Sequence, residues 1–389
     1  MRIFKDEEKL SPEYVPQELP HRENELNMLK TYFSSIILGS PSISTRVIIT
    51  GSVGTGKSVL AKLFCQKAVS EAVRKGVELK PLYVNCRISK TTFSLLRKLI
   101  EQLKARLPER GLSNEELFHK FLDYLEYKGF YSIIVLDEVE VLLREEGSEP
   151  FYLFSRVGEE RLKTPRISTI FIFRNPEMLD ALDASTRSSL LGNVIHLREY
   201  DYNQLYDILK YRASLAFRPE VVMDESLHLI ADIASERGDA RYALDILWRA
   251  GKYAEAENST QVMPEHVRKA TASVYPTIRR EHLEFLEQHS KLILLALAKA
   301  LEAEKSAYVT SSTLNDYYRL VCEEYDVDPK SYTSFWEALQ RLDDLGIIKI
   351  RVVSEGSRGR KSYISLPGVP TSILKKELEP LLPGKQMRF

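Results

Sequence analysis

Residues 51–58 are Gly-Ser-Val-Gly-Thr-Gly-Lys-Ser and match the pattern G-x-x-x-x-G-K-[ST] at every fixed position. The apolar run at 47–50 predicts a buried strand, and residues 58–73 repeat apolar side chains at helical spacing. A strand, a glycine-rich turn and a helix in this order direct backbone N–H groups and the positive helix end toward phosphate oxygens. The predicted phosphate-binding residues are Gly51, Ser52, Val53, Gly54, Thr55, Gly56, Lys57 and Ser58.

Such a site also needs a carboxylate at the end of a neighbouring strand, because Mg²⁺ prefers hard oxygen ligands. Residues 133–138, Ile-Ile-Val-Leu-Asp-Glu, provide one. We expect Asp137 and the Ser58 hydroxyl to hold the metal, and Lys57 to reach the β- and γ-phosphates. Glu138 would orient and deprotonate the attacking water. Taken alone, the two acids fit a strand end before a helix cap equally well. Downstream of a phosphate loop the metal site is favoured, with ATP or ADP and Mg²⁺ as cofactors.

The first half of the chain predicts an α/β fold. Short apolar runs alternate with helical stretches, and this alternation indicates a mainly parallel sheet with helices on both faces. The predicted strands are 47–50, 81–84, 132–136 and 168–173, and the predicted helices are 58–73, 91–107, 113–128 and 150–162.

The second half predicts two further domains. After residue 200 the strand signals stop, and amphipathic helices at 202–217, 224–236, 239–257 and 264–273 indicate an all-helical lid. Helices at 281–304, 310–325 and 331–345 are then followed by short strands at 347–353 and 362–366, the pattern of a winged helix-turn-helix. We therefore expect a nucleotide-binding α/β domain at 1–200, a helical lid at 201–275 and a winged-helix domain at 276–389.

The predicted hairpin near the C-terminus is strongly basic. Between Lys349 and Lys361 the chain has five basic residues and one acid, Glu355. Such a density at a glycine-containing turn suits a phosphate backbone or a minor groove. The start of the 331–345 helix combines basic, hydroxyl and aromatic side chains that could enter a major groove. The predicted DNA-binding residues are Lys330, Tyr332, Thr333, Ser334, Arg351, Arg358, Gly359, Arg360 and Lys361.

Composition limits the other possibilities. The formal net charge is zero, so nucleic-acid binding must depend on a local basic patch. The three cysteines are far apart in sequence and indicate a reducing, intracellular compartment. Residues 1–6 become acidic too early for a signal peptide, and the longest apolar run, 292–298, is far shorter than a membrane span. We expect a cytoplasmic protein with no membrane association.

These features together resemble the AAA+ ATPases, and among them the archaeal relatives of the eukaryotic origin-recognition and Cdc-six replication initiators. The resemblance extends over nearly the whole chain. Its specific parts are the phosphate loop, Val15-Pro16, Leu19-Pro20-His21-Arg22-Glu23, Val84-Asn85-Cys86-Arg87, Asp137-Glu138 and Gly238-Asp239-Ala240-Arg241. It implies an AAA+ module, a helical lid and a winged helix.

The resemblance also implies roles for individual residues. Arg241 matches the lid arginine that reaches the γ-phosphate, and Asn175 has the place of the polar sensor after the strand at 168–173. Val15, Pro16 and Arg22 resemble residues that enclose adenine. Family members often have an arginine where this chain has Ser185, so Arg187 becomes a shifted candidate for an arginine that acts on a neighbour's ATP.

The resemblance implies a weak ATPase that acts as a conformational switch in a replication initiator. Its expected partners are double-stranded origin DNA, other initiator subunits and the replicative helicase, and we expect it to be nucleoid-associated. Two other classes stay open on the residues alone. One is a winged-helix transcriptional or defence regulator with an ATPase module. The other is a P-loop kinase, which would usually lack the Asp137-Glu138 pair.

Overall fold

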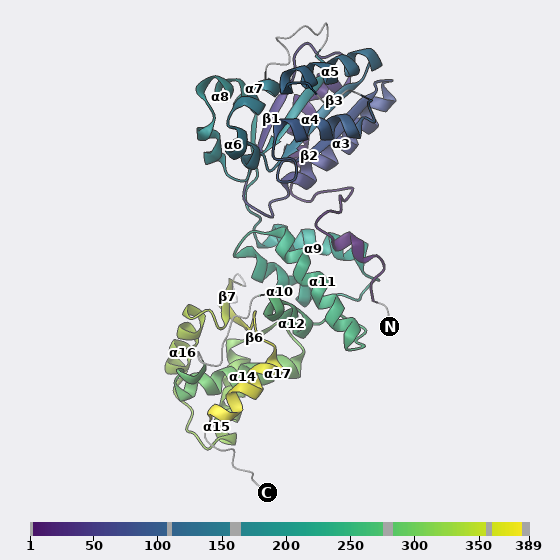
Figure 1. Ribbon diagram of the computed structural model, residues 1–389. Coiled ribbons are helices and arrows are strands. Elements are labelled where there is room, and N and C mark those ends of the chain that lie inside the picture. Colours follow the sequence, from purple (N-terminus) through teal and green to yellow (C-terminus); the bar gives the residue numbers. More distant parts are fainter. Residues whose placement is uncertain (1–2, 107–110, 156–164, 275–282, 355–359, 383–389) are drawn as a thin grey trace. The chain divides into compact units, whose positions relative to one another are not determined.

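The computed structural model describes residues 3–106, 111–155, 165–274, 283–354 and 360–382 (Figure 1). The chain forms two compact units. We call Glu13–Tyr200 with Gly238–Ala240 the sheet unit, and Met1–Pro12 with Asp201–Arg237 and Arg241–Phe389 the helical unit.

The sheet unit contains a five-stranded parallel sheet in the order β2-β3-β4-β1-β5. This confirms the predicted α/β fold with its parallel sheet. The order brings β3 and β1 to either side of β4, although they are far apart in sequence. The strands are β1 (Arg46–Thr50), β2 (Leu79–Asn85), β3 (Tyr131–Asp137), β4 (Ile167–Ile172) and β5 (Val194–His196).

Helices cover both faces of this sheet, because neighbouring residues on a strand point to opposite sides. Along β1, Val47 and Ile49 join a core with helices α1, α2 and α3, whereas Ile48 joins a second core with α4 to α8. Every residue of β4 is buried. The helices are α1 (Glu23–Tyr32), α2 (Ser34–Ile37), α3 (Lys57–Arg74), α4 (Thr92–Gln102), α5 (Asn114–Lys128), α6 (Glu140–Glu146), α7 (Glu149–Ser155) and α8 (Ala184–Leu190), with the 3₁₀ helix η2 (Pro176–Ala181).

The helical unit begins with the lid. The N-terminal residues pack with it, since the Phe4 ring stacks on Phe217 at 4.6 Å and the Lys5 N–H donates to the Ala216 carbonyl at 2.8 Å. Arg212 holds the same segment by donating to the Lys9 and Ser11 carbonyls. The lid elements are η1 (Glu7–Leu10), α9 (Tyr202–Ala216), α10 (Asp224–Ser235), α11 (Ala240–Ala256) and α12 (Pro264–Val274).

The winged helix follows, with its own apolar core built on α14 and the helices that pack against it. A three-stranded antiparallel sheet in the order β6-β8-β7 adds one short strand to the predicted hairpin. The elements are α14 (Gln288–Glu304), β6 (Tyr308–Thr310), α15 (Ser311–Glu324), α16 (Tyr332–Asp344), β7 (Lys349–Ser354), β8 (Arg360–Ser365), α17 (Thr371–Leu378) and η4 (Glu379–Leu381). Among the described residues, no helix is long and apolar enough to cross a membrane.

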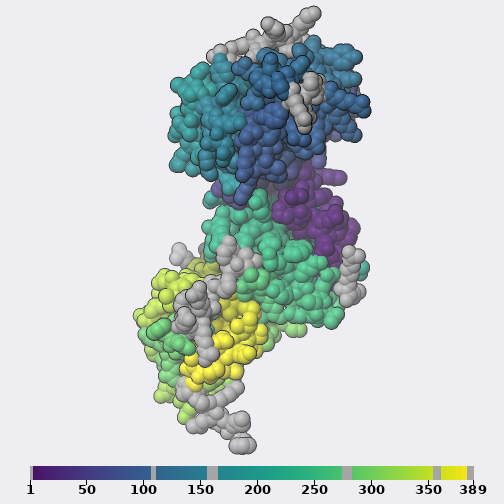
Figure 2. Space-filling view, in the orientation of Figure 1, coloured from purple at the N-terminus to yellow at the C-terminus, as the bar shows by residue number. Residues whose placement is uncertain are grey.

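The lid and the winged helix are joined by a buried arginine. Arg268 of α12 is 1 % exposed, and its guanidinium donates to the carbonyls of Ser306 at 2.9 Å and Leu366 at 3.2 Å. Glu265, one turn earlier, pairs with Arg268 at 3.2 Å and accepts the N–H of Thr371 at 2.9 Å. Burial lowers the pKa of Arg268, although Glu265 opposes this shift. Figure 2 shows the two domains packed directly against each other.

We predict that Arg268→Met destabilises the helical unit by about 3 kcal/mol, because three backbone carbonyls, those of Leu366, Ser306 and Ala307, and Glu265 lose their cationic partner. The chain has two tryptophans, Trp248 and Trp336, and both lie in this unit, so their fluorescence during urea unfolding reports on it alone. Arg249→Met is the matched control. Arg249 lies on α11, where it forms only a partly exposed ion pair with Asp245 of that helix. Equal unfolding midpoints for both variants would contradict the prediction.

Candidate nucleotide site and DNA-binding surface

The phosphate loop joins the end of β1 to the start of α3 through three glycines in unusual backbone conformations. Gly51, Gly54 and Gly56 have φ values of +149°, +81° and +88°. A Cβ at Gly54 would lie 1.8 Å from Oδ1 of Asp239. The Ala240 N–H donates to the Gly54 carbonyl at 3.2 Å. The loop therefore has no room for side chains on this side, and the segment before Arg241 packs against it.

Polar groups within the loop fit a phosphate ligand. Lys57 is 8 % exposed, and its ammonium donates to the carbonyls of Gly51 at 2.6 Å and Ser52 at 2.7 Å. The Ser52 hydroxyl is buried and has no hydrogen-bond partner within the described residues. The Thr55 hydroxyl also donates to the Ser52 carbonyl, at 2.9 Å. The loop thus surrounds a buried cation and leaves a hydroxyl able to bond to an anion, as a nucleotide phosphate requires.

The predicted metal ligands meet at the same edge of the sheet. Asp137 ends β3 and is 3 % exposed, and its carboxylate accepts the Tyr83 hydroxyl from β2. Burial and the Asp137 charge raise the pKa of Tyr83, whereas a hydrogen bond with Ser58 acts to lower it. Tyr83 therefore contacts both residues that we predicted as Mg²⁺ ligands. The sequence analysis missed this tyrosine.

A metal ion at this site would need oxygen ligands other than protein carboxylates. No group of three histidine, cysteine, aspartate or glutamate side chains able to hold a metal occurs in the described parts of the chain. Mg²⁺ is commonly held by one or two carboxylates together with hydroxyl, water and phosphate oxygens. The donor set of Ser58 and Asp137 fits this mode of binding.

Glu138 follows Asp137 in a left-handed backbone conformation, with φ +54°. Its carboxylate pairs with the Arg174 guanidinium, a partner that the sequence analysis did not identify. Burial acts to raise the pKa of Glu138, but the hydrogen bond and charge of Arg174 outweigh it, so the pKa lies below its ordinary value. Asn175 also lies just after β4, where its side chain accepts the N–H of Glu177 at 3.0 Å as the cap of η2.

Arg22 holds the backbone of the phosphate loop in place. It is 4 % exposed and donates to the Thr55 carbonyl at 3.2 Å, the Arg198 carbonyl at 2.7 Å and the Tyr200 hydroxyl at 3.1 Å. Its guanidinium also lies over the Tyr200 ring, 4.2 Å from the centroid. The Tyr200 hydroxyl would lie 2.9 Å from a Cβ at Gly56. Arg22 and Tyr200 thus fix the position of the loop.

The remaining predicted nucleotide-site residues are more dispersed. Pro16 is buried and Val15 is partly buried. Arg187 of α8 pairs with Asp180 at 2.6 Å. Arg241 lies in the helical unit, next in the chain to the loop-contacting Gly238–Ala240.

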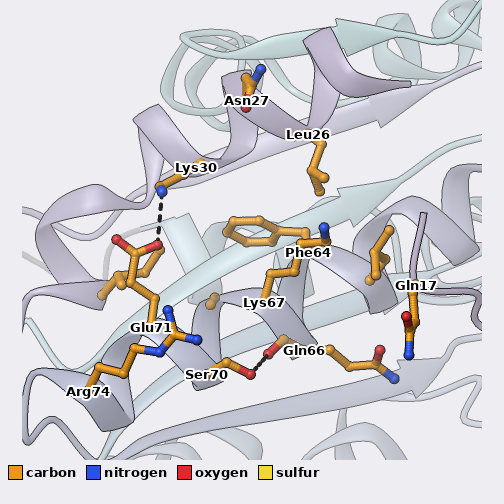
Figure 3. Close-up of a pocket in the computed structure, with 13 residues that line it drawn as sticks. Gln17, Leu26, Asn27, Lys30, Phe64, Gln66, Lys67, Ser70, Glu71 and Arg74 are labelled. Atoms are coloured by element: carbon orange, nitrogen blue, oxygen red, sulfur yellow. Dashed lines mark hydrogen bonds and ion pairs between the residues drawn. The ribbon is translucent and has the colours of Figure 1, made fainter. Parts of the chain in front are cut away.

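A hollow of about 520 Å³ in the sheet unit lies between α1 and α3 and includes no predicted site residue (Figure 3). An ion pair between Lys30 and Glu71, at 3.0 Å, joins its two helices. This hollow lies along the later turns of α3, from Leu63 to Arg74, whereas the phosphate loop precedes the first turn.

The winged helix has a polar groove of about 410 Å³. Two predicted DNA-binding residues, Tyr332 of α16 and Lys361 of β8, line this groove. Its other lining residues were not predicted to contact DNA. Its lining residues are Thr310, Ser311, Ser312, Tyr332, Trp336, Lys361 and Ser362. Hydroxyl groups, a cation and two aromatic rings are side chains that protein–DNA interfaces use for phosphates and sugars.

The other predicted DNA-binding residues have different surroundings. The Arg351 guanidinium lies over the Tyr202 ring of the lid, 4.1 Å from its centroid. Lys330 is 3.9 Å from Glu287, Ser334 forms part of the α16 cap with Ser331, and Thr333 is exposed. Arg360 begins β8, whereas Arg358 and Gly359 lie outside the described residues.

Comparisons with known proteins agree on one family. Three family models match in succession: an AAA domain over 45–182, a Cdc6 AAA+ ATPase-type lid domain over 206–272, and a CDC6 C-terminal winged helix domain over 281–376. The ORC1-type DNA replication protein 2 of Saccharolobus solfataricus is 35 % identical, with 94 % of this chain and 90 % of that protein covered. The ORC1-type DNA replication protein of Thermococcus kodakarensis is 32 % identical, with 95 % and 89 % covered.

Solved structures agree with this result. Cdc6p from Pyrobaculum aerophilum matches with a TM-score of 0.85 and 30 % identity, covering 97 % of this chain and 98 % of that one. The Aeropyrum pernix ORC1 protein, solved in complex with DNA, matches with a TM-score of 0.64 and 30 % identity, covering 98 % and 97 %. The Aeropyrum pernix ORC2 protein, in ADPNP and ADP complexes, matches with a TM-score of 0.66 and 25 % identity, covering 97 % and 98 %.

We predict that Gly54→Ala weakens ATP binding by about tenfold or more. A non-glycine residue at this φ costs about 1–2 kcal/mol, and Asp239 would also have to move away from the loop. Gly192→Ala is the matched control in the same unit, because a Cβ there meets nothing within 4 Å. Titration with a fluorescent ATP analogue compares the two variants. Wild-type affinity in the Gly54 variant would show that the loop tolerates a side chain.

Proposed function

The chain belongs to the ORC1/Cdc6 family of AAA+ DNA replication initiators, and we propose that it binds double-stranded origin DNA through its winged helix and uses ATP as a slow conformational switch. The observation that supports the ATP-binding part most strongly is the phosphate loop, in which the Lys57 ammonium is held by the Gly51 and Ser52 carbonyls and the buried Ser52 hydroxyl has no partner within the described residues. Family membership supports ATPase activity, and the slow, switch-like character is part of the proposal.

Each residue of the nucleotide site has a distinct proposed role. When bound, Mg²⁺ would neutralise phosphate charge, and Ser58 and Asp137 are the residues that would hold it. Lys57 binds the β- and γ-phosphates, and backbone N–H groups of residues 51–56 orient them. Glu138 accepts the proton of the attacking water, which Asn175 helps to orient. Arg241 contacts the γ-phosphate, and Val15 and Pro16 enclose the base.

The DNA contacts divide between two parts of the winged helix. The start of α16 enters the major groove with Tyr332, Thr333 and Ser334, while the polar groove beside it receives the phosphate backbone. The basic hairpin, with Arg358, Gly359, Arg360 and Lys361, follows the backbone or a minor groove. Lys330 and Arg351 flank this surface, and the contact with Tyr202 would have to open before Arg351 could reach DNA.

The proposal includes protein partners. Arg187 is exposed enough to act on ATP held by a neighbouring initiator subunit, at the cost of its pair with Asp180. Binding to origin DNA would make the protein nucleoid-associated. Recruitment of the replicative helicase is the step that initiation requires next, and this chain would contribute to it.

Two substitutions should separate nucleotide binding from hydrolysis. Lys57→Ala should weaken ATP binding by about 10- to 100-fold, because it removes charge-assisted bonds to phosphate. Glu138→Gln should keep ATP affinity but lower kcat by about 10²- to 10⁴-fold, because only the base is lost. Lys67→Ala and Glu145→Gln, which change exposed residues on α3 and α6, serve as controls. Equal loss of binding in both site variants would contradict the division of roles.

The basic hairpin should contribute a measurable part of the salt dependence of DNA binding. Each cation that neutralises a phosphate adds about 0.9 to the slope of log affinity against log salt concentration. Replacing Arg358 and Arg360 by alanine should therefore flatten the slope by up to about two units. The control replaces the exposed Lys305 and Lys376 and removes the same charge. If the two double variants had the same slope, the hairpin would be no more than a solvated turn.

A further inference from the structure

Two basic residues of strand β7 lie against the lid (Figure 1). The Lys349 ammonium donates to the Glu236 carboxylate at 3.0 Å and to the Asp232 carbonyl at 3.2 Å, near the C-terminal end of α10. It also lies 3.6 Å from the Asp232 carboxylate. The Arg351 guanidinium lies over the ring of Tyr202 at the start of α9, 4.1 Å from its centroid. The lid thus binds both cations.

These two cations share one face of the hairpin with Lys361. Side chains alternate between the two faces of a strand, so Lys349, Arg351 and Val353 point to the same side. Val353 is paired with Lys361 of β8, and directly opposite residues of an antiparallel pair share a face. Lys361 lines the polar groove, the proposed site of the DNA backbone. One basic face therefore extends from that groove to the lid, and the lid covers part of it.

The lid offers these cations the same chemistry as a phosphate backbone. Its carboxylate and carbonyl oxygens accept hydrogen bonds from Lys349, as phosphate oxygens would. Burial raises the pKa of Asp232, while the charges of Lys349 and Arg351 act to lower it. Burial acts to lower the pKa of Arg351, but the hydrogen bond with Tyr202 and the charge of Asp232 outweigh it, so this pKa lies above its ordinary value. Because a cation that moves to a phosphate must leave these partners, DNA and the lid compete for it.

Opening these contacts does not require the lid and the winged helix to separate. The Lys349 side chain is 27 % exposed and that of Glu236 is 65 % exposed, so water reaches their ion pair. The Arg268 guanidinium, which joins the two domains, bonds to carbonyls that precede β6 and follow β8. The cations of β7 can therefore leave the lid while the bonds of Arg268 stay in place.

We propose that the edge of the lid formed by Tyr202, Asp232 and Glu236 competes with DNA for Lys349 and Arg351, so that the hairpin binds DNA at full strength only when these cations leave the lid. The inference rests on the proposed DNA-binding role of the winged helix. It adds Lys349 to the DNA contacts, a residue that the sequence analysis counted in the basic hairpin but did not assign to DNA. It also gives the lid a direct effect on DNA affinity.

The test measures the affinity of the full chain for a fluorescein-labelled DNA duplex of mixed sequence at low salt. Tyr202→Leu should tighten binding about two- to fivefold, because a partly exposed cation–π contact no longer opposes the release of Arg351. Tyr202→Phe should stay near the wild-type affinity, since it keeps the ring and loses only the hydroxyl, which lies 2.6 Å from Nδ1 of His228. In an Arg351→Gln background, Tyr202→Leu should have no effect on affinity.

A second set of variants tests Lys349 independently and decides the question if Tyr202→Leu does not fold, which circular dichroism melting checks. Glu236→Gln should tighten binding about twofold more than Glu220→Gln, which removes the same charge from another exposed position of the lid. This gain should vanish in a Lys349→Gln background, because the carboxylate of Glu236 then has no cation to withhold from DNA.

Unchanged or weaker binding by Tyr202→Leu and Glu236→Gln alike would overturn the competition. If the double alanine variant of Arg358 and Arg360 still bound more weakly than the wild type, DNA binding through the winged helix would stand. Gains that persist in the Arg351→Gln and Lys349→Gln backgrounds would also overturn the inference, because the lid would then act through other groups. Failure of the wild type and of every variant to bind the duplex would overturn the proposed function together with the inference.

Discussion

The turn from β1 into α3 is the constraint on which the nucleotide site depends. The chain must reverse from an extended strand into a helix through left-handed glycines, and a Cβ at Gly54 would collide with Asp239. Because glycine is flexible, other residues must hold the loop in this conformation. Arg22 does so by donating a hydrogen bond to the Thr55 carbonyl, and its guanidinium is itself held over the Tyr200 ring. The backbone geometry that exposes N–H groups to phosphate is thus maintained by residues far away in sequence.

In the helical unit, Arg268 holds the lid and the winged helix together. A buried guanidinium bonded to carbonyls of the winged helix gives the lid and the winged helix little freedom to move apart. Lys349 adds a partly exposed link to Glu236 at 3.0 Å, and Arg351 stacks on Tyr202. A displacement of the lid helices would therefore carry the winged helix with them.

Local patterns predicted much of the molecule. The phosphate loop, the end of β3 at Asp137 and the three-part architecture each depend on residues close together in sequence, so the sequence sufficed for them. Contacts between distant segments were not predictable in this way. Tyr83 and Arg174 reach the site through strand order and register, and Tyr200 reaches it through its contacts with Arg22 and Gly56. The sequence also could not show that Arg351 packs on Tyr202 of the lid. A basic hairpin pattern does not indicate which other domain each face of the hairpin contacts.

The central claim is that one chain recognises specific double-stranded DNA and that the bound nucleotide alters this recognition. Footprinting of the purified protein on fragments covering its own chromosome, with ATP and with ADP, tests it most directly. The account predicts protection confined to a few discrete regions, with an extent or affinity that differs between the two nucleotides. Uniform protection along the DNA, or the same footprint at the same protein concentration with both nucleotides, would contradict it.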